Sequence, residues 1–226
     1  MRDLRLKHDL RLSWQTTRDF LKRHWIAIGI CLLATALFAI FAGFPNDPAL
    51  ISWLRAGKDK KLREIAGQIG DWGGLAQYNF LIVIGLWAVG RVRRSRFLQR
   101  LAVVTFLSTF IAGAFCNVFR FSVGRPRPFT KESHLAFKGP QSLPKFHGFP
   151  SGHTSTAFGT AIPLLIAVPE VGVPATIFAG AMAWARVYDK QHYPTDVIVG
   201  AIIGILAGIV SGWPMLKIRR RLKRGP

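Results

Sequence analysis

Long parts of this sequence contain no charged residue, although the chain as a whole is strongly basic. Of its 226 residues, 31 are Lys or Arg and only 11 are Asp or Glu, a formal net charge of +20. A surface helix of a soluble protein carries charged side chains along its outer face. The charge-free runs have no such face, which argues against a soluble helical core.

Cysteine is scarce as well, with two residues in the whole chain. Both Cys31 and Cys116 fall inside charge-free runs. We interpret them as inert core residues rather than disulfide partners. A disulfide-stapled fold is thereby excluded, and nothing follows about the redox compartment.

Five apolar stretches predict membrane-spanning helices, which need about 20 residues at a rise of 1.5 Å. Four have the length of one crossing: Trp25–Phe44, Trp72–Gly90, Leu101–Phe119 and Val197–Leu216. The fifth, Thr154–Ala185, carries the single charge Glu170 and is too long for one crossing. Pro169, Gly172 and Pro174 predict a tight turn in its middle, between two helices of about 24 Å each. The sequence therefore predicts an all-α integral membrane protein with six transmembrane helices.

Basic residues outside the spans predict the orientation of the chain. Six spans place both termini and the loop between the second and third spans on one side. Lys and Arg in short flanking segments mark the cytoplasmic side, and they gather in 1–24, 91–100 and 217–224. This distribution explains the charge without a nucleic-acid partner. We expect a basic N-terminal segment (1–24), a six-span domain (25–216) and a basic cytoplasmic tail (217–226), in a bacterial inner membrane.

Three segments outside the spans carry further expectations. Asn-Asp-Pro at 46–48 is a helix-start signal, and the apolar and basic residues after it predict an interfacial helix between the first two spans. Residues 1–24 leave two alternatives open, an amphipathic helix on the cytoplasmic leaflet or a disordered basic tail. Phe129–Phe149 is a long loop for which a functional role is expected. We assign no role to His134 or His147.

The first motif with chemical content follows the third span. Arg120, Arg125 and Arg127 lie within eight positions of one another. Guanidinium groups bind phosphate through paired hydrogen bonds and keep their charge. Three of them beside a membrane are costly unless they share an anion. Taken alone, such a segment is more typical of a solvated anchor.

The second motif, Pro150–His153, opens the fourth span. Pro150 and Ser151 before an apolar run predict a helix start. Free N–H groups and the dipole at a helix N-terminus bind anions. Gly152 permits close approach of a phosphate, Ser151 adds a hydroxyl, and His153 stands in the first turn. Four residues alone are a weak signal.

The third motif lies between the fifth and sixth spans and contains Arg186, His192 and Asp196. Pro194 fits the first turn of the last helix, so Asp196 lies near its start and His192 just before it. A carboxylate partner fixes the tautomer of a nucleophilic imidazole. The alternative is that Asp196 only caps the helix. The six-span model places all three motifs on the same outer side.

Together the motifs resemble the signature of the type 2 phosphatidic acid phosphatase superfamily, which reads basic-x6-Arg-Pro, Pro-Ser-Gly-His and Ser-Arg-x5-His-x3-Asp. The resemblance covers about Trp25 to Leu216, including the six-helix layout. Two positions depart from it. Arg120 stands where the family usually has Lys, which keeps the charge. Ala185 stands where the family usually has Ser, which removes one hydroxyl donor for phosphate.

The resemblance implies a lipid phosphatase that uses no metal and no cofactor. His192 would form a phosphohistidine, Asp196 would orient it, and His153 would protonate the leaving oxygen and then activate water. Positioning and charge stabilisation suffice for phosphoryl transfer, and no His, Glu and Asp cluster occurs at metal-ligand spacing. The expected phosphate-binding residues are Arg120, Arg127, Arg186, Ser151 and Gly152, with Arg125 as a further candidate.

The expected substrate is a membrane lipid phosphate on the extracytoplasmic leaflet: a polyprenyl pyrophosphate, phosphatidate, phosphatidylglycerophosphate or a lipid A-like glycolipid. One alternative is a lipid phosphotransferase that passes the phosphoryl group to another lipid. Another is a membrane protein that binds lipid phosphate without catalysis. A haloperoxidase shares the motifs, but the six spans argue against it. The sequence identifies neither the lipid nor the oligomeric state.

Overall fold

The computed structural model describes residues 2–55, 59–72 and 77–223, with the side chains of 14–55, 59–71 and 78–219. Every regular element in these ranges is a helix, which confirms the all-α prediction there. The long helices are α1 (Arg2–Phe38), α2 (Phe44–Leu54), α3 (Lys60–Trp72), α4 (Gln77–Val92), α5 (Arg96–Val123), α6 (Gly152–Ala167), α7 (Pro169–Tyr188) and α8 (Pro194–Lys223). The short ones are the π-helical turn η1 (Ala39–Gly43) and the 3-10 turns η2 (Pro128–Thr130) and η3 (Pro144–Phe146).

Three helical stretches are long and apolar enough to cross a membrane, by length and composition. They are Trp14–Leu54, Arg96–Thr130 and Pro194–Arg219, and they contain the first, third and last predicted spans. Tyr78–Val92 is a shorter apolar helix. The structure therefore confirms the membrane character of the chain, with three candidate spans.

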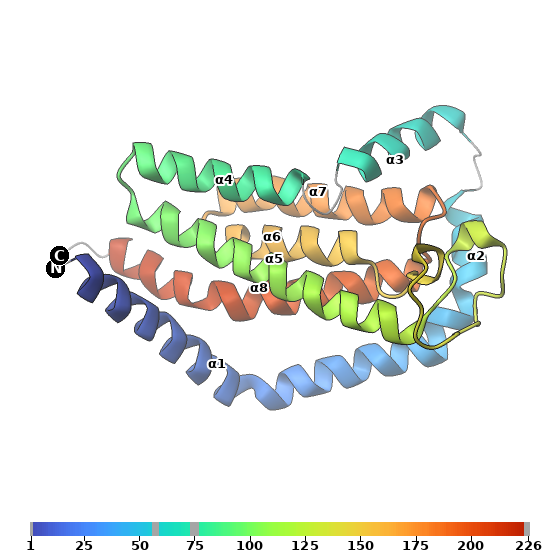
Figure 1. Cartoon of the computed structure of the whole chain (residues 1–226), viewed down its shortest axis with the longest axis horizontal. Helices are drawn as coiled ribbons and strands as arrows, with labels where there is room; N and C mark the ends of the chain where they lie inside the picture. Colours follow the sequence, from blue (N-terminus) through green and yellow to red (C-terminus); the bar gives the residue numbers. More distant parts are fainter. Residues whose placement is uncertain (1, 56–58, 73–76, 224–226) are drawn as a thin grey trace.

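Helix α6 lies at the centre of the bundle, where it packs against α5, α7 and α8 (Figure 1). Helix α4 packs on α5, and α1 packs on α8. Much of the buried core consists of alanine, including Ala157, Ala161, Ala175 and Ala179. Small side chains let helix backbones approach closely, as in membrane-embedded bundles.

A row of glycines brings α8 against α6. Gly200, Gly204, Gly208 and Gly212 recur every four residues along α8, on one face of the helix. A Cβ atom at Gly200 would lie 2.6 Å from the carbonyl oxygen of Ser151, closer than real Cβ contacts allow. Only glycine therefore permits this approach, which places the start of α6 beside the start of α8.

The predicted hairpin in 154–185 forms with a tighter turn than expected. A single residue, Val168, separates α6 from α7, and α7 begins at Pro169. Helix α6 has 16 residues, about 24 Å of helix, as the sequence indicated. Helix α7 has 20 residues, about 30 Å, and so is longer than predicted.

The predicted helix start at 46–48 is wrong. The chain is helical from Arg2 to Leu54, because η1 joins α1 to α2 without a break and Pro48 lies inside α2. A π turn adds a residue to the helical register and so carries the chain past the two prolines. The amphipathic helix is instead the separate α3, and of the two alternatives for 1–24 the structure has a helix.

The two ends of the bundle differ in what they collect. Figure 1 shows both termini and the α4–α5 turn at one end. The opposite end holds α2, α3 and the loop between α5 and α6, together with the starts of α6 and α8. All three sequence motifs therefore lie at the same end of the bundle, away from the termini.

Candidate active site

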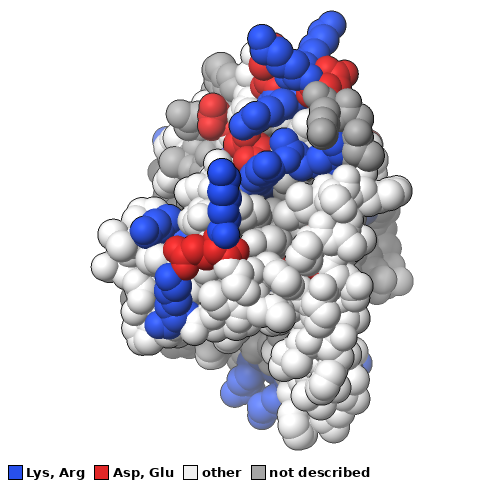
Figure 2. All heavy atoms as spheres, turned by 90° about the vertical axis from the view of Figure 1, so that its right-hand side faces the viewer, with Lys and Arg blue, Asp and Glu red and all other residues white. Residues whose placement is uncertain are grey.

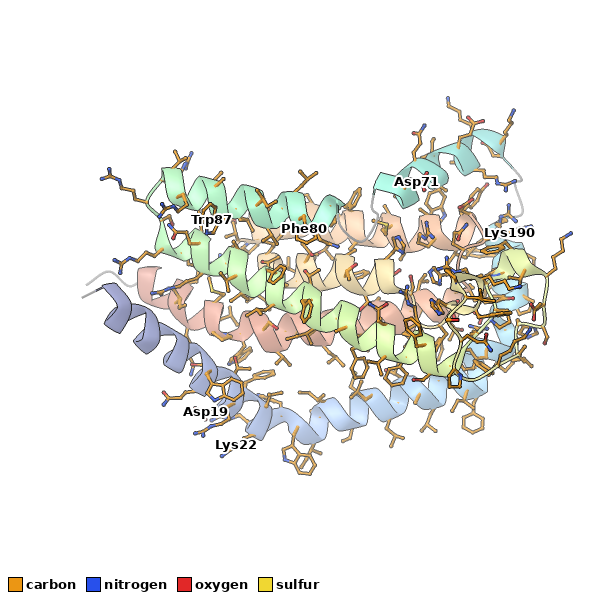
Figure 3. The ribbon with its side chains drawn as sticks, in the orientation of Figure 1. Asp19, Lys22, Asp71, Phe80, Trp87 and Lys190 are labelled. Carbon is orange, nitrogen blue, oxygen red and sulfur yellow. The ribbon has the colours of Figure 1, made fainter. Side chains whose placement is uncertain are left out.

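Each of the three motifs lies at a helix terminus at the same end of the bundle, and this brings the motifs together. Helix α5 stops at Gly124, which adopts a left-handed conformation with φ of 62° as its C-cap. A side chain there would collide with the carbonyl oxygen of Gly139, so the turn requires glycine. Figure 3 shows the side chains that crowd this end of the bundle, near Lys190.

The start of α6 forms the floor of the site. Ser151 is the buried N-cap of α6, and its Oγ accepts a hydrogen bond of 3.0 Å from the hydroxyl of Thr154. The N–H of Ser151 donates to the carbonyl of Asp196 at 2.9 Å, which joins the second motif to the third. A Cβ at Gly152 would lie 2.9 Å from Nη1 of Arg120. Glycine therefore lets this guanidinium rest on the helix start, where the sequence predicts the approach of a phosphate.

His192 is fully buried, and one of its two ring nitrogens has no hydrogen-bond partner among the described residues. Its Nδ1 lies 2.7 Å from the carbonyl oxygen of Gly148. Because a carbonyl only accepts, Nδ1 carries the proton and Nε2 keeps its lone pair. Among the residues that the structure describes, none hydrogen-bonds Nε2. The ring is thus held in the tautomer that a histidine nucleophile requires.

Asp196 makes different contacts from those the sequence indicated. Its Oδ2 lies 3.6 Å from Nδ1 of His192, which is beyond hydrogen-bond distance. Instead Oδ2 accepts from the N–H of Tyr193 at 2.8 Å, and Oδ1 accepts from Arg125 at 2.5 Å. The carbonyl of Gly148 therefore orients the imidazole directly, while Asp196 caps α8 and binds an arginine.

Arg125 is enclosed by protein groups. Its side chain is 0% exposed and donates to Asp196, to Asp47 at 2.7 Å and to the carbonyl of His134 at 2.9 Å. The rings of Phe44 and Tyr193 lie 4.6 and 4.3 Å from the guanidinium carbon, as in cation–π contacts. All three guanidinium nitrogens already donate to protein oxygens. This placement differs from the phosphate-binding position considered for Arg125.

Asp47, which the sequence reasoning missed, completes this buried network. Its Oδ1 accepts from both the N–H and the hydroxyl of Thr195, at 2.9 and 2.8 Å. A Cβ at Gly43 would lie 2.5 Å from the Thr195 hydroxyl, so glycine is needed on the same face of the helix. One signal was present: an isolated carboxylate directly after a charge-free run is costly without a partner.

The other three motif arginines have no carboxylate partner within the described side chains. The Nε–H groups of Arg120 and Arg186 are buried and donate no hydrogen bond to any described residue. Burial, followed by the charges of Arg127 and Arg186, holds the pKa of His192 well below its usual value. Uncompensated positive charge around a neutral imidazole is the electrostatic pattern of an anion site.

Backbone carbonyls of the loop between α5 and α6 hold the reactive side chains in place. They pair as follows: His134 accepts from Arg125, Pro144 from Arg127, and Gly148 from His192. The loop is tied to α5 by the N–H of Gln141, which donates to the carbonyl of Phe121 at 2.9 Å. The main chain of this loop therefore helps to position three side chains at this end of the bundle.

His153 and Ala185 lie in different surroundings, one at the start of α6 and the other in an apolar cluster. His153 stands in the first turn of α6, where its Nδ1 is buried and, among the described residues, has no partner. Ala185 packs in an apolar cluster with Ala66 and Tyr188. The alanine that departs from the family pattern thus serves the contact between α3 and α7.

The charged groups at this end suit an anion. In residues 2–55, 59–72 and 77–223, no group of three or more His, Cys, Asp or Glu side chains is placed to hold a metal ion. Three arginines, a helix N-terminus and two histidines meet there instead. A phosphate group fits these donors in charge and in hydrogen bonding.

Comparison with known proteins points the same way. Lipid A 1-phosphatase of Rhizobium etli is 26% identical over 220 residues, 85% of this chain and 90% of that protein. Undecaprenyl-diphosphatase of Sulfolobus acidocaldarius is 28% identical over 209 residues, 88% of this chain and 97% of that protein. The crystal structure of Aquifex aeolicus LpxE has the same fold at a TM-score of 0.50 and 22% identity, over 72% of this chain and 92% of that one. The sequence model of the PAP2 superfamily matches residues 101–219, which contain all three motifs, and the chain belongs to that superfamily.

Proposed function

We propose that this protein is a membrane lipid phosphatase that works through a phosphohistidine at His192. One observation carries the proposal: a neutral, buried imidazole has no described partner at Nε2 and lies among three arginines that form no ion pair with a described carboxylate. The relatives named above act on lipid A and on undecaprenyl diphosphate, which supports a phosphorylated lipid as substrate.

In the first step, the lone pair on Nε2 of His192 attacks phosphorus and forms a P–N bond. The P–O bond to the lipid breaks, and the leaving oxygen takes a proton from His153, whose protonated form the negative charge of the bound phosphate would stabilise. The proton stays on Nδ1 of His192 and remains hydrogen-bonded to the carbonyl of Gly148, which stabilises the positive charge on the phosphorylated ring. The dephosphorylated lipid leaves, and the phosphoryl group stays on the enzyme.

In the second step, water attacks the phosphohistidine. The now neutral His153 accepts a proton from the water as its oxygen bonds to phosphorus. The P–N bond breaks, its electron pair returns to Nε2, and inorganic phosphate is released. His192 and His153 regain their starting states, so no co-reactant other than water is consumed.

The arginines act on the charge of the transferring group. Arg120, Arg127 and Arg186 would hold its equatorial oxygens, with the hydroxyl of Ser151 and the N–H of Gly152 at the helix start. Gly152 contributes no side chain, and Arg120 already rests against it. Asp196 would act indirectly, because it holds Arg125 and the start of α8 in place rather than contacting the phosphate.

The placement in the membrane extends the three candidate spans to six. Helices α4, α6 and α7 would complete the bundle as shorter crossings beside α5 and α8. The described parts of the basic segments, 2–24, 91–100 and 217–223, lie toward the end opposite the site (Figure 1). The excess of Lys and Arg on the cytoplasmic side supports cytoplasmic termini and an extracytoplasmic active site.

Phosphate release by the detergent-purified protein in excess EDTA tests this function. The substrates are polyprenyl diphosphate, phosphatidate, phosphatidylglycerophosphate and lipid A, with His192→Ala beside the wild type. His24→Ala is the matched control, because His24 packs against Phe20 and Trp213 away from the site. We expect release by the wild type and the control, and none by His192→Ala.

Trapping the intermediate separates the mechanism from other phosphatase chemistry. With a 32P-labelled lipid, alkaline quenching should leave label on the wild type that acid removes, as for a phosphoramidate. His192→Ala should carry none. Full turnover in that variant would exclude the mechanism, and label passed to an added lipid rather than to water would indicate a phosphotransferase.

A further inference from the structure

Four basic residues gather at the rim of the site, outside the catalytic pocket. This rim cluster consists of Arg55, Arg63, Lys131 and Lys190. The charge of Arg55 is the largest cause that lowers the pKa of Lys190, with Arg63 and Lys131 acting in the same direction. Figure 2, which views this end of the molecule, shows Lys and Arg side chains gathered over its upper part with a few acidic ones among them.

The docking of α3 on α7 brings these residues together. Ala66 of α3 packs on Tyr188, the last residue of α7. The guanidinium of Arg55 lies 5.7 Å from the centre of the Tyr188 ring. Lys190 follows two residues later, and Arg63 projects from α3. The cluster is therefore built by packed elements rather than by neighbours in sequence.

Nearby carboxylates are engaged elsewhere. Asp59 accepts from the N–H groups at the start of α3, Glu132 pairs with Lys138, and Asp189 accepts from Gln191. Within the described side chains, no member of the rim cluster forms an ion pair. The Nε atom of Arg55 is buried and has no hydrogen-bond partner there. The four cationic side chains therefore lie near one another, and the Nε–H of Arg55 has no acceptor among the described residues.

Both lysines occupy backbone positions that favour glycine. Lys131 and Lys190 have φ angles of 60° and 58°, in the left-handed region. Residues other than glycine are strained in this conformation. Neither lysine forms a hydrogen bond through its side chain among the described residues. The structure of the chain itself therefore gives no reason for lysine instead of glycine.

The rim cluster is continuous with the pocket. Lys190 is exposed and stands two residues before the fully buried His192. Between them, Gln191 accepts from Arg127 at 2.9 Å. A Cβ at Gly70 of α3 would lie 2.8 Å from Nη1 of Arg186. A headgroup with its phosphorus at His192 would emerge at this rim.

We propose that the rim cluster binds a second phosphate on the headgroup of the lipid whose first phosphate is cleaved at His192. This inference rests on the proposed function and narrows its substrate to a lipid with two phosphates apart on one headgroup. The two phosphorus atoms of a diphosphate would both lie among the arginines around His192. A second phosphate elsewhere on the headgroup could instead reach the cationic rim cluster, which adjoins these arginines but does not include them. The phosphorylated glycolipids among the candidate substrates have the required chemistry.

The test compares two forms of one glycolipid, with both phosphates or with the scissile one alone, in micelles of a neutral detergent. We expect Lys131→Gln/Lys190→Gln to lower kcat/KM about tenfold for the bis-phosphorylated form through KM, as two exposed charge pairs would. Activity on the mono-phosphorylated form should not change. Arg94→Gln is the matched control, because Arg94 is also basic and left-handed, with φ of 51°, but lies at the other end.

Equal losses on both lipids, or an intact preference in the double variant, would overturn the inference. An effect that appears only when phosphatidylglycerol is added to the micelles would overturn it too, because the cations would then bind neighbouring lipid. Lys190→Gly should keep or raise Tm while losing the preference, which a structural lysine would not do. If the wild type releases no phosphate, the proposed function fails. Titration of both lipids into His192→Ala then still decides the rim cluster.

Discussion

Two kinds of arginine meet at the catalytic end of this protein. Arg125 is buried between Asp47 and Asp196, and the rings of Phe44 and Tyr193 lie against its guanidinium. Arg120 and Arg186 come from the same motifs, yet their Nε atoms are buried without a partner among the described residues. Identical side chains thus serve structure in one case and leave charge for an anion in the other.

The difference follows from what each arginine neutralises. A buried charge needs a partner of opposite sign. Arg125 has two carboxylates within the fold, so it contributes no net positive charge to the pocket. The open arginines are desolvated without such a partner, so a bound phosphate is the group that satisfies them. Motif position alone does not separate the two kinds.

The largest expected effect comes from breaking the paired arginine. Arg125→Gln leaves Asp47 and Asp196 buried without a countercharge and should lower the free energy of unfolding by about 3–5 kcal/mol. Unfolding in detergent measures this loss. Adding Asp47→Asn should recover part of it, because one uncompensated charge is removed. A loss below 1 kcal/mol for Arg125→Gln would mean that the pairing is not structural.

An open arginine should show the opposite balance between stability and activity. Arg120→Gln leaves no carboxylate unpaired, so Tm should stay the same or rise. Steady-state phosphate release should show kcat/KM falling by about 10²–10³, the usual loss when one charge-stabilising donor is removed. Arg120→Lys, which restores the charge, should recover most of the activity. A drop in Tm equal to that of Arg125→Gln would erase the distinction between the two kinds.

The pH profile reports the open arginines through His192. Its pKa is depressed by burial and then by Arg127 and Arg186, and the neutral form attacks. The acid limb of kcat/KM should therefore lie well below about 6.5, the usual histidine value. Arg127→Gln removes one positive charge, raises this pKa and should move the limb to higher pH.

Two points make the profile interpretable. The ionisation of the substrate phosphate is measured separately and removed from the data. Lys138→Gln serves as the control, because Lys138 is not among the charges that act on His192. An acid limb that stays in place in Arg127→Gln would show that burial alone depresses the pKa.

The smallest effect is expected at an exposed ion pair in the same loop. Lys138 pairs with Glu132, and the two side chains are 39% and 32% exposed. Lys138→Gln should change the free energy of unfolding by less than about 1 kcal/mol, because solvent screens such pairs. The same unfolding assay gives the value. A loss as large as that of Arg125→Gln would indicate that exposure does not control these energies.

Local signals in the sequence predicted the parts of the site that depend on helix ends. Ser151 caps α6 and Pro194 opens α8, as their residue types indicated. These positions follow from the chemistry of free N–H groups and of proline. The convergence of the motifs at one end also followed, because alternating crossings return the chain to the same side.

The remaining features depend on contacts that no local pattern records. Asp47 reaches Thr195 across 148 positions, and the carbonyl that orients His192 belongs to Gly148. Any residue supplies a carbonyl, so its identity cannot reveal this role. The glycine row in α8 is an exception, because glycine recurs there every four residues in the sequence itself. The prediction of a helix start at 46–48 is wrong because the π turn η1 continues the helix through the prolines that suggested a break.

The contact of α2 with α8 also constrains how the protein is made. Asp47 belongs to one of the first helices to leave the ribosome, whereas Thr195 and Asp196 belong to the last. Until synthesis is almost complete, this carboxylate sits at the end of an apolar helix without its final partners. A stalled or truncated chain would expose that defect. The buried network around Arg125 can therefore form only after the last helix has been made and packed against α2.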